Sequence, residues 1–290
     1  MRQSECQALD LLGTPCQFWL PDDLASARAL KKQFQNPAYV YEAPMLALLG
    51  YLLKDWDGSA AAPVVLDIGA FIGYYTVYAA KLLGKRGQVW AFETNARYAE
   101  VLAANLRLNQ VEAEICLQGL SDQVEVLKVI GSAMSAQSEA PGTPLPAEPL
   151  DDFCLRQGLL PNVILLDVHG FEAKILKGMS ALLKGPLQYL LLELHPNLFL
   201  EEFTPGLSAW DILDQLDAAG FYTYYFAGHR YPWTDGMARF FEQEKWAYLQ
   251  LTPENRKYLL FDRYNQLFLF SSKLPIEEII GLPVADPALE

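Results

Sequence analysis

Two of the three histidines in this chain stand in matching surroundings, each two residues after an acid. Asp167 precedes His169 in the string DVHG, and Glu193 precedes His195 in ELHP, whereas His229 lies outside such a string. Both strings end short apolar runs typical of strands, and side chains two residues apart on a strand point to the same face. We therefore predict four groups that can exchange protons or bind a metal ion, gathered at the ends of two neighbouring strands.

Three interpretations of this cluster stay open. The imidazole of His195 or His169 could act as a general base, oriented by Asp167 or Glu193, because the ordinary pKa of histidine is about 6.5. The four side chains could instead hold a divalent metal ion that polarises a bound hydroxyl as a Lewis acid. They could also form a buried hydrogen-bond network without a chemical role.

A second candidate site lies in the stretch VVLDIGAFIGYYT, where an apolar strand runs directly into a helical pattern. Asp67 stands at the end of that strand, Gly69 permits a sharp turn and a close approach of a ligand, and Gly73 lets the next helix pack closely on the sheet. The following predicted strand ends at Glu93, where a carboxylate can accept hydrogen bonds from both hydroxyls of a ribose. The spacing predicts a nucleoside pocket.

The positions of the glycines indicate which nucleoside binds. A dinucleotide fingerprint GxGxxG starting at Gly69 requires glycines at two positions that are Phe71 and Tyr74 in this chain. This mismatch disfavours a nucleotide-dependent oxidoreductase. S-adenosylmethionine fits better, because Asp67 can hold its ammonium group and the N–H groups at the helix start can hold its carboxylate.

Several strings together resemble, in order and spacing, the FkbM-type methyltransferases, a class I family that uses S-adenosylmethionine. They span Val64 to Pro196 and comprise VLDIGAFIGYYT, AFETNARYAEVLAANLRLN, GLSD, PLDDF, LLDVHGFEAKILKGM and LLLELHP. The resemblance implies an O-methyltransferase that acts on a hydroxyl of a small molecule such as a sugar, a lipid or a secondary metabolite.

The same resemblance assigns roles to residues of this chain. The methionyl part of the cofactor would lie against Asp67, Gly69 and Gly73, the ribose against Glu93, and the adenine edge against Ser121 and Asp122. The candidate cofactor-binding residues are Asp67, Gly69, Phe71, Gly73, Glu93, Thr94, Ser121, Asp122 and Asp167. The candidate catalytic residues are His195, His169, Asp167 and Glu193.

Two residues depart from the pattern of that family. Phe71 stands where the family usually carries Asn, and His169 stands where it usually carries Glu. Phe71 could narrow the methionine pocket, and His169 replaces a carboxylate beside the expected substrate position. The alternative function is therefore an inactive module that binds S-adenosylmethionine and acts as a partner or sensor.

The elements that must position these residues alternate along the chain. Apolar strands such as VVLDI, QVWAF and VILLDV are separated by helical patterns, which is typical of a parallel sheet covered on both faces. We predict an α/β fold with the doubly wound, seven-stranded, Rossmann-like sheet of class I methyltransferases over residues 61–290. Residues 1–60 are predicted as an N-terminal helical arm, and residues 131–150 as a surface loop.

The C-terminal part carries a different pattern. Two strands, FYTYYFA and NQLFLF, follow each other without a helix and predict an antiparallel pair at one edge of the sheet, with an irregular lid over residues 228–264 between them. The many aromatic residues between Phe221 and Tyr248 could pack in the core or form a wall over the acceptor. Tyr39, Tyr41 and Glu42 would close the opposite side.

The overall charge restricts the partners. The chain has 290 residues, of which 52 % are hydrophobic, and a formal net charge of −13. This charge weakens attraction to nucleic-acid phosphates and to anionic lipid, and it favours a small-molecule partner. The sequence does not indicate an oligomeric state.

Cysteine usage and hydropathy predict the compartment. The chain has four scattered cysteines without a CxxC pair, which disfavours a zinc ribbon or a disulfide framework. No basic and then apolar leader opens the chain, and no apolar run reaches the roughly 18 to 20 residues that cross a bilayer. We therefore expect a soluble cytoplasmic protein without membrane insertion.

Overall fold

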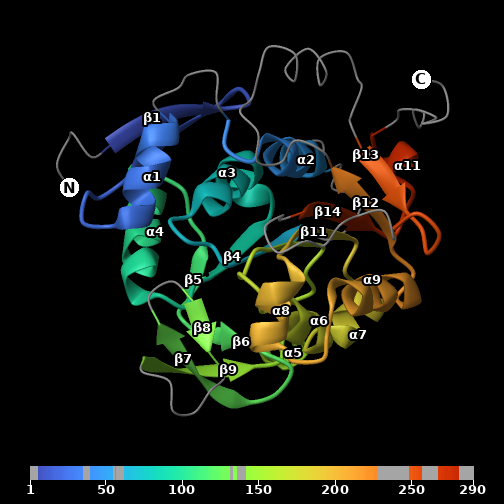
Figure 1. The fold of residues 1–290 in the computed structure, drawn as a ribbon. Helices are drawn as coiled ribbons and strands as arrows, with labels where there is room; N and C mark the ends of the chain where they lie inside the picture. Colours follow the sequence, from blue (N-terminus) through green and yellow to red (C-terminus); the bar gives the residue numbers. More distant parts are fainter. Residues whose placement is uncertain are drawn as a thin grey trace.

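A computed structural model describes residues 6–34, 40–54, 56, 62–130, 133–135, 142–226, 248–256 and 267–280. Its centre is an eight-stranded mixed sheet with the order β13-β12-β14-β11-β10-β3-β4-β5 (Figure 1). The strands are β3 (Val64–Ile68), β4 (Gln88–Phe92), β5 (Glu114–Cys116), β10 (Val163–Leu166), β11 (Tyr189–Leu194), β12 (Tyr222–Phe226), β13 (Tyr248–Leu251) and β14 (Leu267–Ser272).

The strand order reverses between β3 and β10. From β3 the chain continues outward through β4 and β5, whereas β10 and β11 lie on the other side of β3. In this parallel part, Ile68 pairs with Phe92 on one side and with Leu166 on the other. The segments that follow β3, β4 and β10 therefore leave the sheet at one edge, at the position where doubly wound sheets bind ligands.

Helices cover both faces of the sheet (Figure 1). Alternate residues of a strand enter different cores, so that Val65 packs with the helices of one face and Leu66 with those of the other. The first face carries α1 (Ala25–Phe34), α2 (Ala43–Lys54), α3 (Tyr74–Leu83), α4 (Ala96–Asn109) and α11 (Ile276–Ile280). The second carries α5 (Leu150–Gln157), α6 (Glu172–Lys177), α7 (Ser180–Lys184), α8 (Asn197–Phe203) and α9 (Ala209–Ala218).

The C-terminal edge of the sheet confirms the predicted antiparallel pair and adds a strand. β14 lies between β11 and β12 and is antiparallel to both. An eighth strand, β13, pairs with β12 inside the range predicted as an irregular lid. The rest of that lid, residues 228–247 and 257–264, and with it His229, lies outside the described residues. In the described part of the aromatic segment, Phe221, Tyr224 and Phe226 are buried in the core, in line with the packing interpretation.

The predicted helical arm contains the helices α1 and α2, and in addition a hairpin that the prediction did not include. It opens with a hairpin of β1 (Cys6–Leu11) and β2 (Thr14–Trp19), joined at Leu12 and Gly13, which both have positive φ. Buried amides of α4 hold β2 in place: Asn109 Oδ1 accepts a hydrogen bond from the Gln17 N–H at 2.9 Å, and Asn105 Oδ1 accepts one from the Trp19 N–H at 2.7 Å. Long-range hydrogen bonds thus stabilise a strand that local periodicity did not indicate.

The predicted surface loop over residues 131–150 also contains strands. Two strands lie within this range, β8 (Ala133–Ser135) and β9 (Thr143–Glu148). They form a second sheet with two preceding strands, β6 (Gly119–Leu120) and β7 (Glu125–Ile130), in the order β6-β9-β7-β8. Its strand β9 carries two prolines, which periodicity rules assign to loops or edges.

Among the helices of the described residues, none is long and apolar enough to cross a bilayer.

Candidate active site

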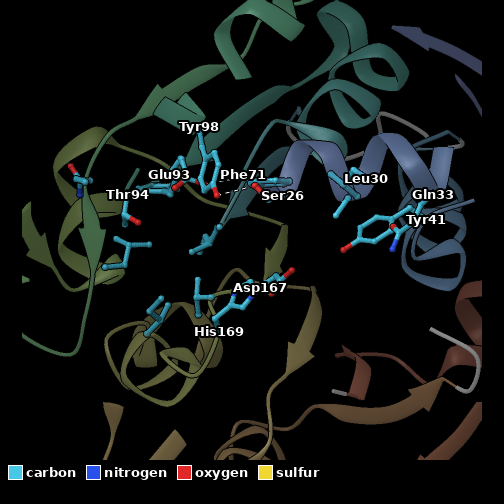
Figure 2. A pocket seen from close by; sticks show the side chains of 18 residues that line it. Ser26, Leu30, Gln33, Tyr41, Phe71, Glu93, Thr94, Tyr98, Asp167 and His169 are labelled. Atoms are coloured by element: carbon cyan, nitrogen blue, oxygen red, sulfur yellow. Dashed lines mark hydrogen bonds and ion pairs between the residues drawn. The ribbon is translucent and has the colours of Figure 1, made fainter. Parts of the chain in front are cut away.

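A cavity of about 410 Å³ opens at the edge where the strand order reverses (Figure 2). It lies beyond the carboxyl ends of β3, β4 and β10, and α1 faces it from the N-terminal arm. Its lining residues are Ser26, Ala29, Leu30, Gln33, Tyr41, Ile68, Gly69, Phe71, Phe92, Glu93, Thr94, Tyr98, Gln118, Leu120, Asp167, Val168, His169 and Ile175.

Glu93 is fixed on the wall of this cavity by backbone N–H groups. Its Oε2 accepts a hydrogen bond from the Phe71 N–H at 2.7 Å, and its Oε1 accepts one from the Asn95 N–H at 2.8 Å. Burial raises the pKa of the Glu93 carboxyl to about 7, although these hydrogen bonds favour the charged form. The residue expected to bind ribose therefore stands at the cavity with a set orientation.

Gly69 brings the loop after β3 into direct contact with the loop after β10. Its φ is 88°, and a Cβ at this position would lie 1.8 Å from the backbone carbonyl oxygen of Asp167. Only glycine fits this turn without a shift of backbone. The close approach places Gly69 and Asp167 on the same side of the cavity.

Asp67 does not line the cavity, contrary to the expectation that it faces a bound cofactor. It is 3 % exposed, and its Oδ2 accepts a hydrogen bond from the Thr76 hydroxyl at 2.5 Å. Burial raises the pKa of the Asp67 carboxyl to about 6. The reason is the alternation of the strand, because Asp67 shares the face of Val65 and so points at α3.

Phe71 forms part of the cavity wall and leaves the cavity open. Its φ is 51°, and its ring packs edge-on against Tyr98 with 4.6 Å between the ring centroids. Thr94 lies beside it on the wall. Gly73 is not on the wall; a Cβ there would lie 3.0 Å from Leu102 Cγ, so its role is the close packing of α3 on α4.

Ser121 and Asp122, expected at the adenine edge, also lie off the cavity wall. Ser121 is buried and donates a hydrogen bond to Glu125. Asp122 pairs with Lys177 at 2.9 Å. The residues of this segment that line the cavity are Gln118 and Leu120 instead. The sequence analysis gave no signal for Gln118.

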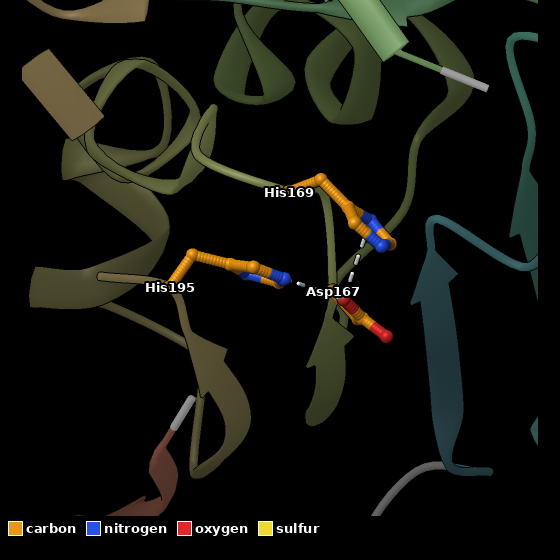
Figure 3. Close-up of side chains that lie close together, drawn as sticks. All are labelled: Asp167, His169 and His195. Carbon is orange, nitrogen blue, oxygen red and sulfur yellow. Dashed lines mark ion pairs between the residues drawn. The ribbon is translucent and has the colours of Figure 1, made fainter. Parts of the chain in front are cut away.

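The structure brings Asp167, His169 and His195 together (Figure 3). Asp167 Oδ1 lies 3.8 Å from His169 Nδ1 and 3.9 Å from His195 Nε2. The two imidazole rings are tilted by 34° with centroids 4.7 Å apart. The His169 side chain is 59 % exposed and lines the cavity, whereas His195 is fully buried behind it. Only one of the two imidazoles can therefore touch a substrate directly.

Glu172, which sequence reasoning missed, sets the orientation of His195. Glu172 Oε1 lies 2.6 Å from His195 Nδ1, and both side chains are fully buried. The Gly170 N–H donates to the same oxygen at 3.1 Å. With Nδ1 donating to the carboxylate, the lone pair of His195 is on Nε2, which faces Asp167. The only sequence signal for Glu172 was its place in the string DVHGFE.

Glu193 and Glu42 add two buried carboxylates to the cluster. One carboxylate oxygen each of Glu42, Glu193 and Asp167 lie within 4.8 Å of one another. Glu42 is 2 % exposed, has a φ of 50° and accepts a hydrogen bond from the Tyr75 hydroxyl at 2.5 Å. The arm thus contributes Glu42 here and Tyr41 to the cavity wall, while Tyr39 lies outside the described residues.

Helix α1 forms a wall of the cavity that the sequence did not indicate. Ser26, Ala29, Leu30 and Gln33 follow the spacing of one helical face and all line the cavity. This face mixes apolar and amide groups. The site therefore has a sheet-edge half around Gly69 and Glu93 and a second half between α1 and the histidine cluster.

These features define a class of protein. A doubly wound sheet with one antiparallel strand inserted near its end, and a cavity at the strand reversal with a carboxylate after the second strand, is the arrangement of a class I methyltransferase. Residues 67–222 match the family model described as the methyltransferase FkbM domain. The match covers more than half of the chain, which therefore belongs to the FkbM methyltransferase family.

Solved structures with similar folds include three methyltransferases. A methyltransferase FkbM from Methylobacillus flagellatus is 16 % identical, with a TM-score of 0.42, over 87 % of this chain and 60 % of that one. A SAM-dependent methyltransferase from Agrobacterium tumefaciens is 12 % identical, with a TM-score of 0.46, over 94 % and 71 %. An rRNA methylase from Streptococcus thermophilus is 13 % identical, with a TM-score of 0.44, over 80 % and 97 %.

The chain spans 60 % of the length of the FkbM structure that it matches. No curated protein matches the chain in sequence.

Proposed function

We propose that this chain transfers a methyl group from S-adenosylmethionine to a hydroxyl oxygen of a small molecule. One observation carries the proposal: a single cavity is lined both by Gly69 and Glu93 and by Asp167 and His169. The first pair suits a nucleoside, and the second pair suits the activation of a hydroxyl.

The residues present fit S-adenosylmethionine. The cavity volume falls in the range of about 300–1,000 Å³ that small-molecule sites occupy. Glu93 would hold the ribose hydroxyls, and the aromatic pair Phe71 and Tyr98 offers ring faces for the adenine or the positive sulfonium. Gln118 replaces Ser121 and Asp122 in this proposal as the side chain near the adenine edge.

When bound, S-adenosylmethionine supplies an electrophilic methyl group on a sulfonium. A lone pair of the acceptor oxygen forms the new C–O bond, the C–S bonding pair stays on sulfur, and the hydroxyl proton passes to a basic group of the cluster. Proton removal of this kind contributes roughly 10² to 10⁴ in rate, and the orientation of the acceptor contributes more.

The geometry separates the roles within the cluster. His169 lines the cavity and is the imidazole that the acceptor can reach. His195 is buried behind Asp167 and held by Glu172, so we assign it a positioning role rather than contact with the acceptor. The hydroxyl is activated either by a base of this cluster or by a metal ion that the cluster holds.

The cavity favours an uncharged acceptor. Of its 18 lining residues, all in the described part of the chain, none is Lys or Arg, while Glu93 and Asp167 are acidic. Leu30 and Ala29 provide an apolar surface on α1, and Gln33 can hydrogen-bond a polar substituent. A phosphate-bearing acceptor such as nucleic acid would meet repulsion both here and from the net charge of −13.

Binding and turnover measurements test the proposal in turn. We expect calorimetric titration to show saturable binding of S-adenosylmethionine and none of NAD, and Glu93→Ala to weaken that binding. Incubation with a panel of neutral hydroxylated compounds should then yield a product 14 mass units heavier together with S-adenosylhomocysteine. Binding of NAD without any binding of S-adenosylmethionine would contradict the cofactor assignment.

A second candidate function is a cofactor-binding module without turnover. It is favoured by Phe71 and His169, which depart from the pattern of the family and both line the cavity. Tight binding of S-adenosylmethionine without product from any acceptor in the panel would support this second function over the first.

A further inference from the structure

We infer that Asp167, His169 and His195 bind a divalent transition-metal ion at the acceptor end of the cavity. The site itself is argued from the geometry of the cluster. Its role, polarising the acceptor hydroxyl, rests on the proposed methyl transfer.

The two imidazole nitrogens lie at distances from Asp167 that one ion can bridge. Asp167 Oδ1, His169 Nδ1 and His195 Nε2 all lie within 4.8 Å of one another, and the two separations from Asp167 are 3.8 and 3.9 Å. Bonds from a metal to nitrogen or oxygen are about 2.0–2.2 Å long, so two ligands of one ion can be up to about 4.4 Å apart. A direct hydrogen bond requires about 3.2 Å or less. Both rings are directed at Asp167 (Figure 3).

His195 is oriented as metal-binding histidines are. A histidine ligand usually donates its second ring N–H to a carboxylate, which fixes the tautomer and increases the basicity of the ligating nitrogen. Glu172 accepts from His195 Nδ1 at 2.6 Å and is itself held by the Gly170 N–H. His195 Nε2 is thereby presented to the same point as the Asp167 carboxylate.

The backbone fixes His169 on the other side of that point. Its φ of 55° is uncommon for a residue other than glycine, and such conformations cluster at ligand and active sites. Gly170 follows with a φ of 101°, and a Cβ there would lie 2.8 Å from Phe199 Cβ. This turn, packed on α8, holds the His169 ring over Asp167.

The surrounding charge favours a cation with mixed nitrogen and oxygen ligands. Glu42 and Glu193, 2 % and 0 % exposed, each place an oxygen within 4.8 Å of Asp167. Buried carboxylates so close together repel each other unless a positive charge lies between them. Two imidazoles with carboxylates suit Mn²⁺, Fe²⁺, Co²⁺ or Zn²⁺ better than Mg²⁺ or Ca²⁺.

The position of the site explains how it would act. Asp167 and His169 line the cavity, so an ion between them is open to a ligand on the cavity side. A hydroxyl bound there loses its proton more readily, which strengthens the nucleophile for methyl transfer. A carboxylate of the cluster can accept the proton.

Metal binding is tested on the full chain after treatment with a chelator. We expect titration with Mn²⁺ and Zn²⁺ to show one saturable site, and Co²⁺ to produce a visible absorption band of a nitrogen-ligated ion. His169→Ala should weaken binding at least 100-fold, and Glu172→Gln about 10- to 100-fold, the usual effect of removing the partner of a histidine ligand. The exposed His169 is suited to substitution without damage to the fold.

Two further variants sharpen the result. His169→Glu keeps a ligand at this position, so it should retain Mn²⁺ binding and shift the cobalt band, because a carboxylate replaces one of the two imidazoles. Glu112→Ala, an exposed acid after α4, should change nothing. The inference is overturned if the chain shows no saturable metal binding, or if His169→Ala and Glu172→Gln bind metal as the parent does.

The test separates this inference from the proposed function. Methyl transfer at full rate after complete metal removal overturns the ion's role and leaves the proposed reaction in place. Stoichiometric metal binding that depends on His169, without methyl transfer to any acceptor, supports the site and contradicts the proposed reaction.

Discussion

At the scale of single residues, the site depends on how buried carboxylates are held. Glu93 accepts hydrogen bonds from two backbone N–H groups on the cavity wall, whereas Asp67, one strand away, fastens α3 through Thr76. Burial raises the pKa of both carboxyls. Their different roles follow from where each side chain points, because both stand at or just after the end of a parallel strand.

The raised pKa of Glu93 predicts how cofactor binding varies with pH. Burial raises this pKa to about 7, so the carboxylate gains a proton as the pH falls through that value and loses an acceptor for ribose. If only the charged form binds, the dissociation constant for S-adenosylmethionine should rise about tenfold between pH 8 and pH 6. Calorimetry between pH 6 and pH 8 at constant ionic strength measures this change in the dissociation constant.

Glu93→Gln provides the comparison for this pH series. The variant should bind S-adenosylmethionine more weakly at pH 8. Its dissociation constant should also lose most of its dependence on pH, since an amide does not titrate in this range. An equally steep profile in Glu93→Gln would assign the titration to another group.

At the scale of elements, the turns after the strands decide which groups meet. Gly69 permits contact between the loops after β3 and β10, and Asn95 begins α4 by accepting hydrogen bonds from two of its N–H groups. Helix α1 completes the cavity from the N-terminal arm. Each of these contacts joins segments that are distant in the chain.

The contact at Gly69 predicts a large effect of a single methyl group. Gly69→Ala places a Cβ 1.8 Å from the Asp167 carbonyl oxygen, so the two loops must separate and binding of S-adenosylmethionine should be lost. Gly206→Ala is the matched control, because Gly206 has a φ of 81° and nothing within 4 Å of its Cβ position. The control should cost only the 1–2 kcal/mol or so of a left-handed residue. Denaturant unfolding and calorimetry compare the two variants.

Helix α1 should control the acceptor without affecting the cofactor. Gln33 lines the cavity and lies apart from Glu93 in Figure 2, so Gln33→Ala should raise the KM for the acceptor severalfold and leave the affinity for S-adenosylmethionine unchanged. Lys32→Ala, an exposed neighbour that does not line the cavity, is the control. Equal effects of Gln33→Ala on both ligands would place α1 at the cofactor instead.

At the scale of the whole molecule, charge and shape restrict the partners. The chain carries a net charge of −13, and the cavity in its described part is lined by two acids, Glu93 and Asp167, and by no Lys or Arg. Buried cores cover both faces of the sheet, and the arm packs against α3 and α4. Charge and cavity together suit the small uncharged acceptor that we propose.

This charge predicts weak interaction with RNA. In a mobility-shift assay at 0.15 M salt, a structured RNA should not be retarded at micromolar protein, because the chain offers few cations to displace phosphate counterions. Lowering the salt to 0.02 M should not change this outcome. Retardation that increases steeply at low salt would indicate a basic surface outside the described residues.

The alternating apolar strands and helices determined the α/β class, and the string DIG with Glu93 after the next strand determined that a ligand site stands at the strand ends. The fold class and the position of the ligand site follow from local properties of the chain. The periodicity and order of the strands determine which residues stand at the carboxyl ends of the parallel strands. The strings DVHG and ELHP likewise predicted a histidine cluster, because the two strands are neighbours.

Only the tertiary structure decided which of these residues reach the cavity. Asp67 points at α3, and Ser121 and Asp122 lie off the cavity wall. Glu172, which the sequence analysis did not single out, orients His195, and Glu42 of the arm lies beside Asp167 and Glu193. The hairpin of the arm forms because Asn105 and Asn109, some ninety residues away, satisfy its backbone. Such contacts depend on packing between distant segments, and local patterns carry no information about it.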